Sequence, residues 1–153
     1  MGDNCRKKLN CIIYSAIVHS IRGDVRLFKT KWFIRYARQE RLDDHSLSGA
    51  SAIERAERGL VDADLGGGII KQRVARTGQG RSGGYRLIIA YHSGKRAVFL
   101  YGFSKSERDN IEADELETLK EIAAAWLEAK NEGLEHAIKE GILKEVSYDD
   151  RKK

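Results

Sequence analysis

The feature that most constrains the fold is a series of three strand-forming segments in the middle of the chain. Residues 69–76 alternate, so that Ile70, Gln72 and Val74 share one face of a strand and Lys71, Arg73 and Ala75 share the other. Residues 85–92 and 97–101 are rich in aromatic and β-branched side chains, and residues 93–96 (Ser-Gly-Lys-Arg) between them are typical of a hairpin turn. We therefore predict an antiparallel meander.

Helical periodicity flanks this meander on both sides. Leu27 and Phe28 are expected to form a short edge strand, and Thr30 to cap a helix that runs to about Arg41. A second helix is predicted over 44–58 with Leu47, Ala50, Ile53 and Ala56 inward, followed by Gly59 and a turn-rich link over 63–68. Trp32, Phe33 and Trp126 are expected in the core, with stacking on a base as the alternative reading.

The C-terminal part predicts further helix. From about Asn110 an apolar stripe (Ile111, Leu116, Leu119, Ile122, Ala123, Trp126, Leu127) indicates a long helix, and Gly133 and Gly141 punctuate a last short one. A chain of 153 residues suits one domain. The predicted class is α+β: two N-terminal helices and a four-stranded, mainly antiparallel sheet with a C-terminal helix packed on it.

Several protein classes are disfavoured. The longest apolar run, residues 12–18, is far short of a membrane span, so no membrane partner is expected. Cys5 and Cys11 both lie near the start, which favours a reducing, cytoplasmic setting, although residues 6–18 also resemble a signal peptide without its cleavage site. The four histidines are scattered, so we expect neither a metal site nor another cofactor.

Charge is unevenly distributed along the chain. Residues 66–108 contain nine Lys or Arg and one acid, whereas residues 109–150 contain thirteen acids and four lysines. Such asymmetry indicates a polyanion-binding middle beside an acidic segment that stays away from the polyanion. A solvated basic face is the plain alternative.

The basic residues of this middle part are placed to converge. Lys71 and Arg73 share a strand face about 7 Å apart, at roughly 3.3 Å rise per residue, and Arg86 is expected on the adjacent strand. Lys105 and Arg108 follow the third strand directly. Two cations at this spacing match successive backbone phosphates and would stabilise charge that develops on a reacting phosphate, so the five are the candidate catalytic residues.

Further residues are candidates for RNA binding. The glycine-rich stretch 77–84 lacks the order of a P-loop and precedes a strand, so it is interpreted as a basic hairpin loop that brings Arg76 and Arg81 to an RNA backbone. Tyr85, Tyr101 and Phe103 flank the basic strands and are candidates for base stacking.

Five stretches of the chain, in this order, resemble the RelE/HigB branch of type II toxins. They are Phe28-Lys-Thr-Lys-Trp-Phe33, residues 59–68, Lys71-Gln-Arg-Val-Ala-Arg76, Gly83-Gly-Tyr-Arg86 and residues 101–111. The resemblance covers roughly residues 25–130 and implies a microbial-ribonuclease-like fold. It also implies a metal-independent endoribonuclease that cleaves mRNA in the ribosomal A site and is blocked by a cognate antitoxin.

Carried over position by position, the resemblance assigns roles to the basic residues. Attack of a ribose 2′-OH on the adjacent phosphate would give a 2′,3′-cyclic phosphate. Arg73 and Arg86 would stabilise the transition state, Lys71 would position or activate the 2′-OH, and Lys105 or Arg108 would serve the leaving side. The Tyr or His that several relatives carry after the last strand is missing, so the general acid and base stay unassigned, with Tyr101 a candidate by proximity.

The resemblance also sets the expected domain limits and partners. Residues 1–24 are an N-terminal extension without a counterpart, 25–147 the toxin domain and 148–153 a basic tail. The partners implied are an antitoxin, the ribosome and mRNA, and operator DNA reached through the antitoxin. Two alternatives remain open: a ParE-like toxin that inhibits gyrase by binding, whose members typically lack so dense a basic set, and an RNA-binding module without cleavage.

Overall fold

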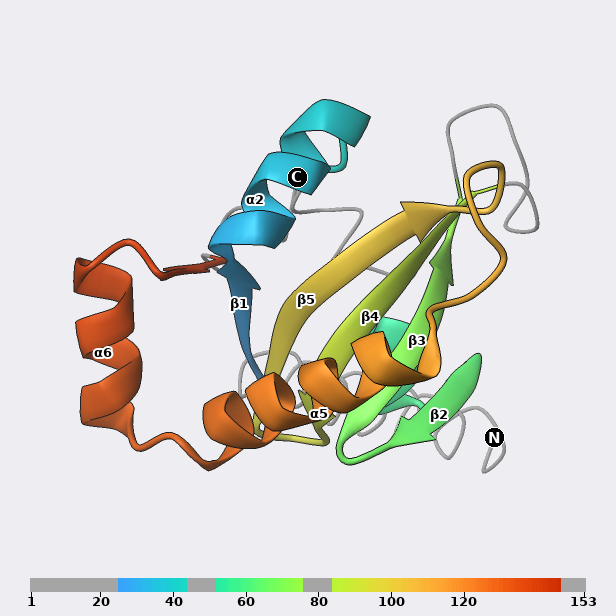
Figure 1. Cartoon of the computed structure of the whole chain (residues 1–153). Coiled ribbons are helices and arrows are strands. Elements are labelled where there is room, and N and C mark those ends of the chain that lie inside the picture. Colours follow the sequence, from blue (N-terminus) through green and yellow to red (C-terminus); the bar gives the residue numbers. More distant parts are fainter. Residues whose placement is uncertain (1–24, 44–51, 76–83, 147–153) are drawn as a thin grey trace, which may run out of the picture.

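The computed structural model describes residues 25–43, 52–75 and 84–146, which form one mixed sheet with helices on both faces (Figure 1). The sheet has six strands in the order β2-β3-β4-β5-β1-β6. The strands are β1 (Arg26–Thr30), β2 (Ala63–Gly66), β3 (Ile69–Val74), β4 (Tyr85–His92), β5 (Arg96–Ser104) and β6 (Leu143–Glu145), and the helices are α2 (Lys31–Glu40), α4 (Ile53–Glu57), α5 (Ala113–Glu128) and α6 (Asn131–Lys139).

The predicted meander is confirmed as β3, β4 and β5, each antiparallel to the next. The sheet has six strands where four were predicted, because β2 and β6 were not expected, and β1 occupies a different position. The strand at Leu27 and Phe28 is not an edge strand, because β1 pairs in parallel with β5 and antiparallel with the short β6. The stretch 63–68 is not only a link: Ala63–Gly66 pairs with β3 as β2, and Gly66, Gly67 and Gly68 form the turn with positive φ angles of 62–82°.

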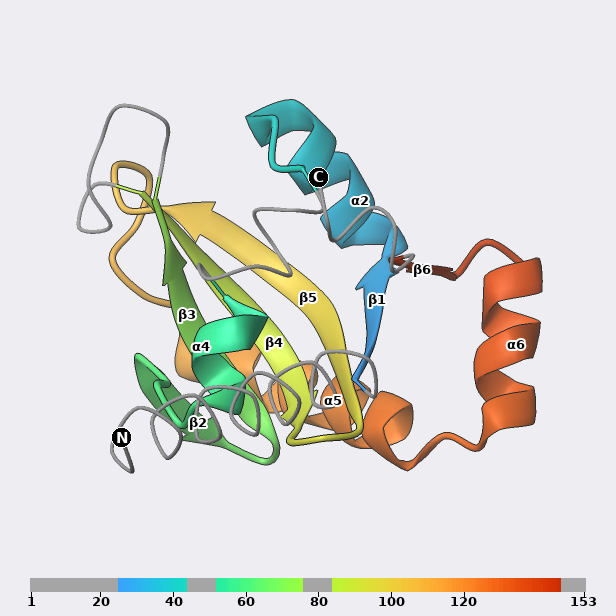
Figure 2. The same ribbon diagram turned by 180° about the vertical axis from the view of Figure 1, so that it is seen from behind.

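The helices divide between the two faces of the sheet. α2 and α4 contribute to one core cluster, with Phe33, Tyr36 and Ile53 against Leu87 and Phe99. α5 and α6 contribute to the other, whose members include residues of β1, β3, β4, β5 and β6. In Figure 1, α5 crosses in front of β3 and β4. In Figure 2, which views the molecule from behind, α4 lies in front of the same strands, so the two helices enclose the sheet between them.

Local sequence explains the helix boundaries. The Thr30 hydroxyl accepts a hydrogen bond of 3.2 Å from the Phe33 amide, which confirms it as the N-cap of α2. Ile53 and Ala56 of α4 are buried as predicted, and Gly59 follows with φ of 79°. Ala52 and Arg58 lie just outside α4 as its N-cap and C-cap, so this part of the helix is shorter than predicted, and residues 44–51, including Leu47 and Ala50, lie outside the described residues.

Two core predictions are wrong. Ile122, assigned to the apolar stripe of the C-terminal helix, is 39% exposed. Trp32 is 43% exposed, because α2 turns Phe33, Tyr36 and Ala37 toward the sheet and leaves the preceding indole at its edge. Trp126 is partly buried against the α5 core, as expected.

Gly102 of β5 is required by the packing of α2. A Cβ atom at this position would lie 2.3 Å from Cε1 of Tyr36, whose ring covers the strand. Gly102→Ala is therefore expected to lower the free energy of unfolding by about 1–3 kcal/mol through overpacking. Gly133→Ala in α6 is the matched control, since its Cβ would meet nothing within 4 Å; it should be neutral or gain up to about 1 kcal/mol. Urea unfolding of both variants checks this, and equal losses would contradict the packing described.

Candidate active site

The pairing of β3 with β4 sets two arginines directly opposite each other. Arg73 is the register partner of Arg86, and Arg86 is in turn the partner of Phe103 on β5. Directly opposed residues of an antiparallel sheet project on the same face, so Arg73, Arg86 and Phe103 form a row across three strands. This is the face that α5 packs on, but the helix crosses it elsewhere: Leu127 lies against Gly68, at the opposite end of β3 from Arg73.

The two arginines differ in exposure. Arg73 is exposed, whereas Arg86 is only 6% exposed and its Nη1 donates a 3.4 Å hydrogen bond to the Gly84 carbonyl. Burial lowers the pKa of the Arg86 guanidinium below its ordinary value, and the positive charge of Arg73 lowers it further; Asp62 and Asp109 act in the opposite direction. An anion bound beside this pair would relieve both effects.

The backbone amide of Arg73 is held at the edge of β3 that faces away from β4. A carboxylate oxygen of Asp62 accepts a 2.6 Å hydrogen bond from the Arg73 amide and one of 3.2 Å from Arg55. Gln72 is fully buried; its amide donates to the carbonyls of Ala52 and Leu60 at 3.0 and 3.1 Å, and its oxygen accepts from the Asp62 amide at 2.8 Å. These bonds fix the strand that carries Arg73.

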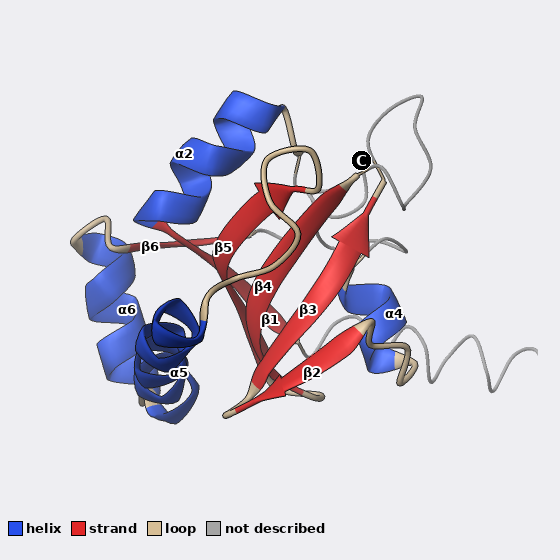
Figure 3. Ribbon diagram, turned by 45° about the vertical axis from the view of Figure 1, so that its right-hand side comes forward, coloured by secondary structure: helices blue, strands red, loops and turns tan. Residues whose placement is uncertain are grey.

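Arg108 reaches the same row from the loop between β5 and α5. Its guanidinium lies over the Phe103 ring at 5.7 Å, and Nη1 is 3.4 Å from the Tyr101 hydroxyl. Glu115, in the first turn of α5, accepts hydrogen bonds of 3.1 and 3.0 Å from the two Nη atoms and raises the pKa of Arg108. Arg108 is therefore positioned by a carboxylate and brings a fixed cation beside Tyr101. Figure 3 shows this loop running from the tip of β5 back to α5.

The two lysines lie at the margins of this row. Lys71 is half-buried and pairs with Ile88, so it shares the face of Arg73 about 7 Å further toward α5. Lys105 is exposed, and its backbone amide donates a 3.5 Å hydrogen bond to the Gly84 carbonyl. This bond places Lys105 at the same end of the sheet as Arg86. We call Lys71, Arg73, Arg86, Lys105 and Arg108 the basic cluster.

Three residues predicted to flank the cluster need separate treatment. Tyr85 lies on the other face, 3% exposed, and its hydroxyl donates to the Glu40 carbonyl at 3.4 Å, so the structure does not bring it to the cluster. Phe103 is in the right row but is 1% exposed beneath Arg108, which leaves no ring face for a base. Tyr101 is partly exposed and does join the cluster. Arg76 and Arg81 lie outside the described residues.

Arg96, one of the nine basic residues counted over residues 66–108, has a structural role. Arg96 is 5% exposed, and its Nη1 donates 2.8 and 2.7 Å hydrogen bonds to the carbonyls of Trp126 and Ala129 at the C-terminal end of α5. A cation is stabilising at this end of a helix because the last carbonyls lack partners within the helix. Arg96 therefore belongs to the packing of α5 and not to the basic cluster.

Sequence reasoning missed the residues that hold the cluster in place. Asp62 and Gln72 lie ten residues apart and Glu115 lies seven residues after Arg108, and none stands in a local motif. The alternation of β3 did indicate a polar side chain at Gln72 on the inward face, which is the one signal that a buried network was present. Within the described ranges, no three His, Cys, Asp or Glu side chains come together as a metal site, and no helix is long and apolar enough to cross a membrane.

Comparison with known proteins identifies the class of protein that carries this fold and cluster. The family model described as "RelE toxin of RelE / RelB toxin-antitoxin system" matches residues 25–146. The protein is thus the toxin component of a toxin–antitoxin system, and a cognate antitoxin is its implied partner. Within that class, the chain belongs to the RelE toxin family. Searches of curated proteins and of solved structures found no match.

The opposed arginines generate a prediction for stability. Like charges directly opposite in a sheet are destabilising by roughly 0.2–1 kcal/mol. Arg73→Gln should therefore raise the free energy of unfolding at low ionic strength by up to about 1 kcal/mol, and the gain should shrink in high salt. Lys139→Gln in α6 removes the same charge from an exposed site and serves as the control. Urea unfolding in low and high salt measures both; identical behaviour of the two variants would contradict the repulsion.

Proposed function

We propose that this RelE-family toxin is a ribosome-dependent mRNA endoribonuclease whose reaction takes place at the basic cluster. The observation that carries the proposal is the direct pairing of Arg73 with Arg86 on one face of the sheet, where Arg73 is exposed. Two guanidinium groups side by side match the oxygens of one phosphodiester, which they can bind through paired hydrogen bonds. Membership of the RelE family supports the same activity.

The proposed reaction is attack of a ribose 2′-OH on the adjacent phosphate. The new bond joins the 2′ oxygen to phosphorus, the bond to the 5′ oxygen of the next nucleotide breaks, and a 2′,3′-cyclic phosphate remains. Arg73 and Arg86 stabilise the charge that develops on the non-bridging oxygens. Lys71, on the same face as Arg73, positions or activates the 2′-OH, and Lys105 or Arg108 serves the leaving oxygen.

The Tyr101 hydroxyl is the candidate for proton transfer. It lies within 3.4 Å of a guanidinium nitrogen of Arg108, and Glu115 holds that guanidinium by two further hydrogen bonds. Arg108 thereby holds the hydroxyl in a fixed position on β5, the strand that pairs with the strand of Arg86. A positioned general acid or base contributes typically 10²–10⁴-fold to rate.

Substitution of Arg86 tests the site. Removal of a preorganised charge from such a transition state costs about 10²–10³ in rate, so Arg86→Ala should abolish growth inhibition and ribosomal mRNA cleavage. Because Arg86 is buried, Arg86→Lys is tested beside it; this variant keeps a cation but loses the planar fork, and it should retain a small part of the activity.

Primer extension on mRNA after brief expression gives the readout, with circular dichroism of each purified variant as the folding control. Cuts within codons that vanish in Arg86→Ala support the proposal. Full cleavage by a folded Arg86→Ala protein would remove Arg86 from the site. Gyrase-dependent DNA breaks without mRNA cuts would identify a gyrase inhibitor instead. If neither mRNA cuts nor DNA breaks are observed, the protein would be an RNA-binding module without cleavage.

A further inference from the structure

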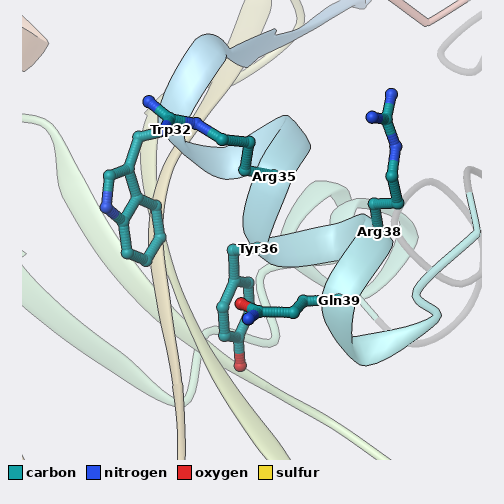
Figure 4. Close-up of a pocket in the computed structure, with 5 residues that line it drawn as sticks. All are labelled: Trp32, Arg35, Tyr36, Arg38 and Gln39. Atoms are coloured by element: carbon teal, nitrogen blue, oxygen red, sulfur yellow. The ribbon is translucent and has the colours of Figure 1, made fainter.

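A hollow on the outer side of α2 carries a second set of residues suited to RNA. It measures about 540 Å³, within the range of small-molecule sites, and Trp32, Arg35, Tyr36, Arg38 and Gln39 line it (Figure 4). Among the described residues that line it, the ionisable groups are the Arg35 and Arg38 guanidinium groups and the Tyr36 phenol, and none is an acid. We propose that this hollow binds one nucleotide of the RNA strand that flanks the reacting phosphate.

The base would stack on Trp32. This indole is 43% exposed, and it is held in place because it stacks on Tyr101 with ring centroids 4.4 Å apart and lies nearly parallel to the Tyr36 ring at 5.5 Å. A large exposed aromatic side chain that its neighbours already order loses little entropy when a base stacks on it. Such stacking is tolerant of base identity because every base has a π face.

The phosphate would bind to Arg35. Among the described residues, no hydrogen bond or ion pair engages the guanidinium of Arg35 or Arg38. In Figure 4 the side chain of Arg35 runs to the same side as Trp32, whereas that of Arg38 points away from the other four residues. Arg35 is thus the cation placed to meet the phosphate of a nucleotide stacked on Trp32, and Arg38 adds charge to the rim.

A buried hydroxyl in the same hollow lacks a partner. Tyr36 is 8% exposed, and its Oη is the buried side-chain polar atom in the described part of the chain for which no hydrogen-bond partner is present. Burial raises the pKa of this phenol, with Glu40 and Glu107 contributing in the same direction, so it stays protonated and able to donate. The Oη atom is closed off from solvent, so a ligand in the hollow would meet this donor only after a shift of the Tyr36 side chain.

The hollow is connected to the basic cluster by direct contacts. Trp32 stacks on Tyr101, and the Tyr101 hydroxyl is 3.4 Å from Arg108. A strand with its reacting phosphate at Arg73 and Arg86 would therefore pass Tyr101 and reach Trp32 with a neighbouring nucleotide. The charge and the exposed indole favour RNA over a protein segment as the occupant.

Binding of a non-cleavable RNA tests the inference separately from catalysis. The chain has two tryptophans, so Trp126→Phe leaves Trp32 as the single tryptophan, whose emission can be excited selectively over that of the six tyrosines. A short 2′-O-methyl oligoribonucleotide cannot undergo 2′-OH attack, and it should quench the Trp32 emission of this variant. A second measurement uses fluorescence anisotropy of the same oligonucleotide carrying a dye label to obtain its affinity. Trp32→Ala should weaken this affinity about 5- to 100-fold, and Trp32→Phe should restore much of the loss.

Charge variants supply the matched comparison. Arg35→Ala should weaken RNA binding several-fold, and the slope of the binding constant against salt concentration should fall by the share of about one phosphate contact. Lys139→Ala on α6 should change the RNA affinity less than about twofold. On programmed ribosomes, Trp32→Ala should raise the toxin concentration needed for half-maximal cleavage, whereas Lys139→Ala should leave it unchanged.

The inference rests on the proposed function, because the bound nucleotide flanks the reacting phosphate, and the outcomes distinguish failure of the one from failure of the other. Quenching by RNA without any mRNA cleavage would contradict the endoribonuclease and leave the nucleotide site standing. Absence of quenching, or equal RNA affinity of the Trp32→Ala and unsubstituted proteins, would overturn the site. Quenching by an acidic peptide but not by RNA would assign the hollow to a protein partner and would also overturn it.

Discussion

The register of β3 on β4 is the constraint on which the rest of the candidate site depends. A slip of one residue would turn Arg73 to the sheet face that packs against α2 and α4, and Gln72 to the face that packs against α5. Gln72 opposes such a slip, because its three hydrogen bonds to Ala52, Leu60 and Asp62 are made only when its side chain is buried. The same register places Arg73 opposite Arg86, so the inward polar network and the outward basic pair have one origin.

The basic pair has a stability cost that the surrounding structure offsets. Two guanidinium groups on one sheet face repel each other, and Arg86 is also desolvated. Gln72 and Asp62 anchor the strand beneath Arg73, and Glu115 fixes Arg108 nearby without contacting the pair. Acidic residues thus organise the cluster from its margins, which agrees with the separation of charge along the sequence.

The sequence predicted the parts of this structure that follow from local periodicity. Alternation gave the meander and the shared face of Lys71 and Arg73, and Thr30 marked the start of α2. It did not predict β6 or the internal position of β1, because three residues after Gly141 carry too little pattern to show a strand whose partner lies more than a hundred residues away. Tyr85 and Trp32 were misplaced for a related reason: their environment is set by the packing of α2 on the sheet.

The chemistry of the cut end distinguishes attack by the ribose 2′-OH from hydrolysis of the phosphodiester by water. Purified toxin and programmed ribosomes would be given an mRNA with a ribose or a 2′-deoxyribose at the scissile nucleotide, and the 3′ end of the upstream fragment would be analysed by mass spectrometry. The account predicts a 2′,3′-cyclic phosphate from the ribose substrate and no cut in the deoxy substrate. Cleavage of the deoxy substrate, or an upstream fragment that ends in a 3′-hydroxyl, would contradict 2′-OH attack at the basic cluster.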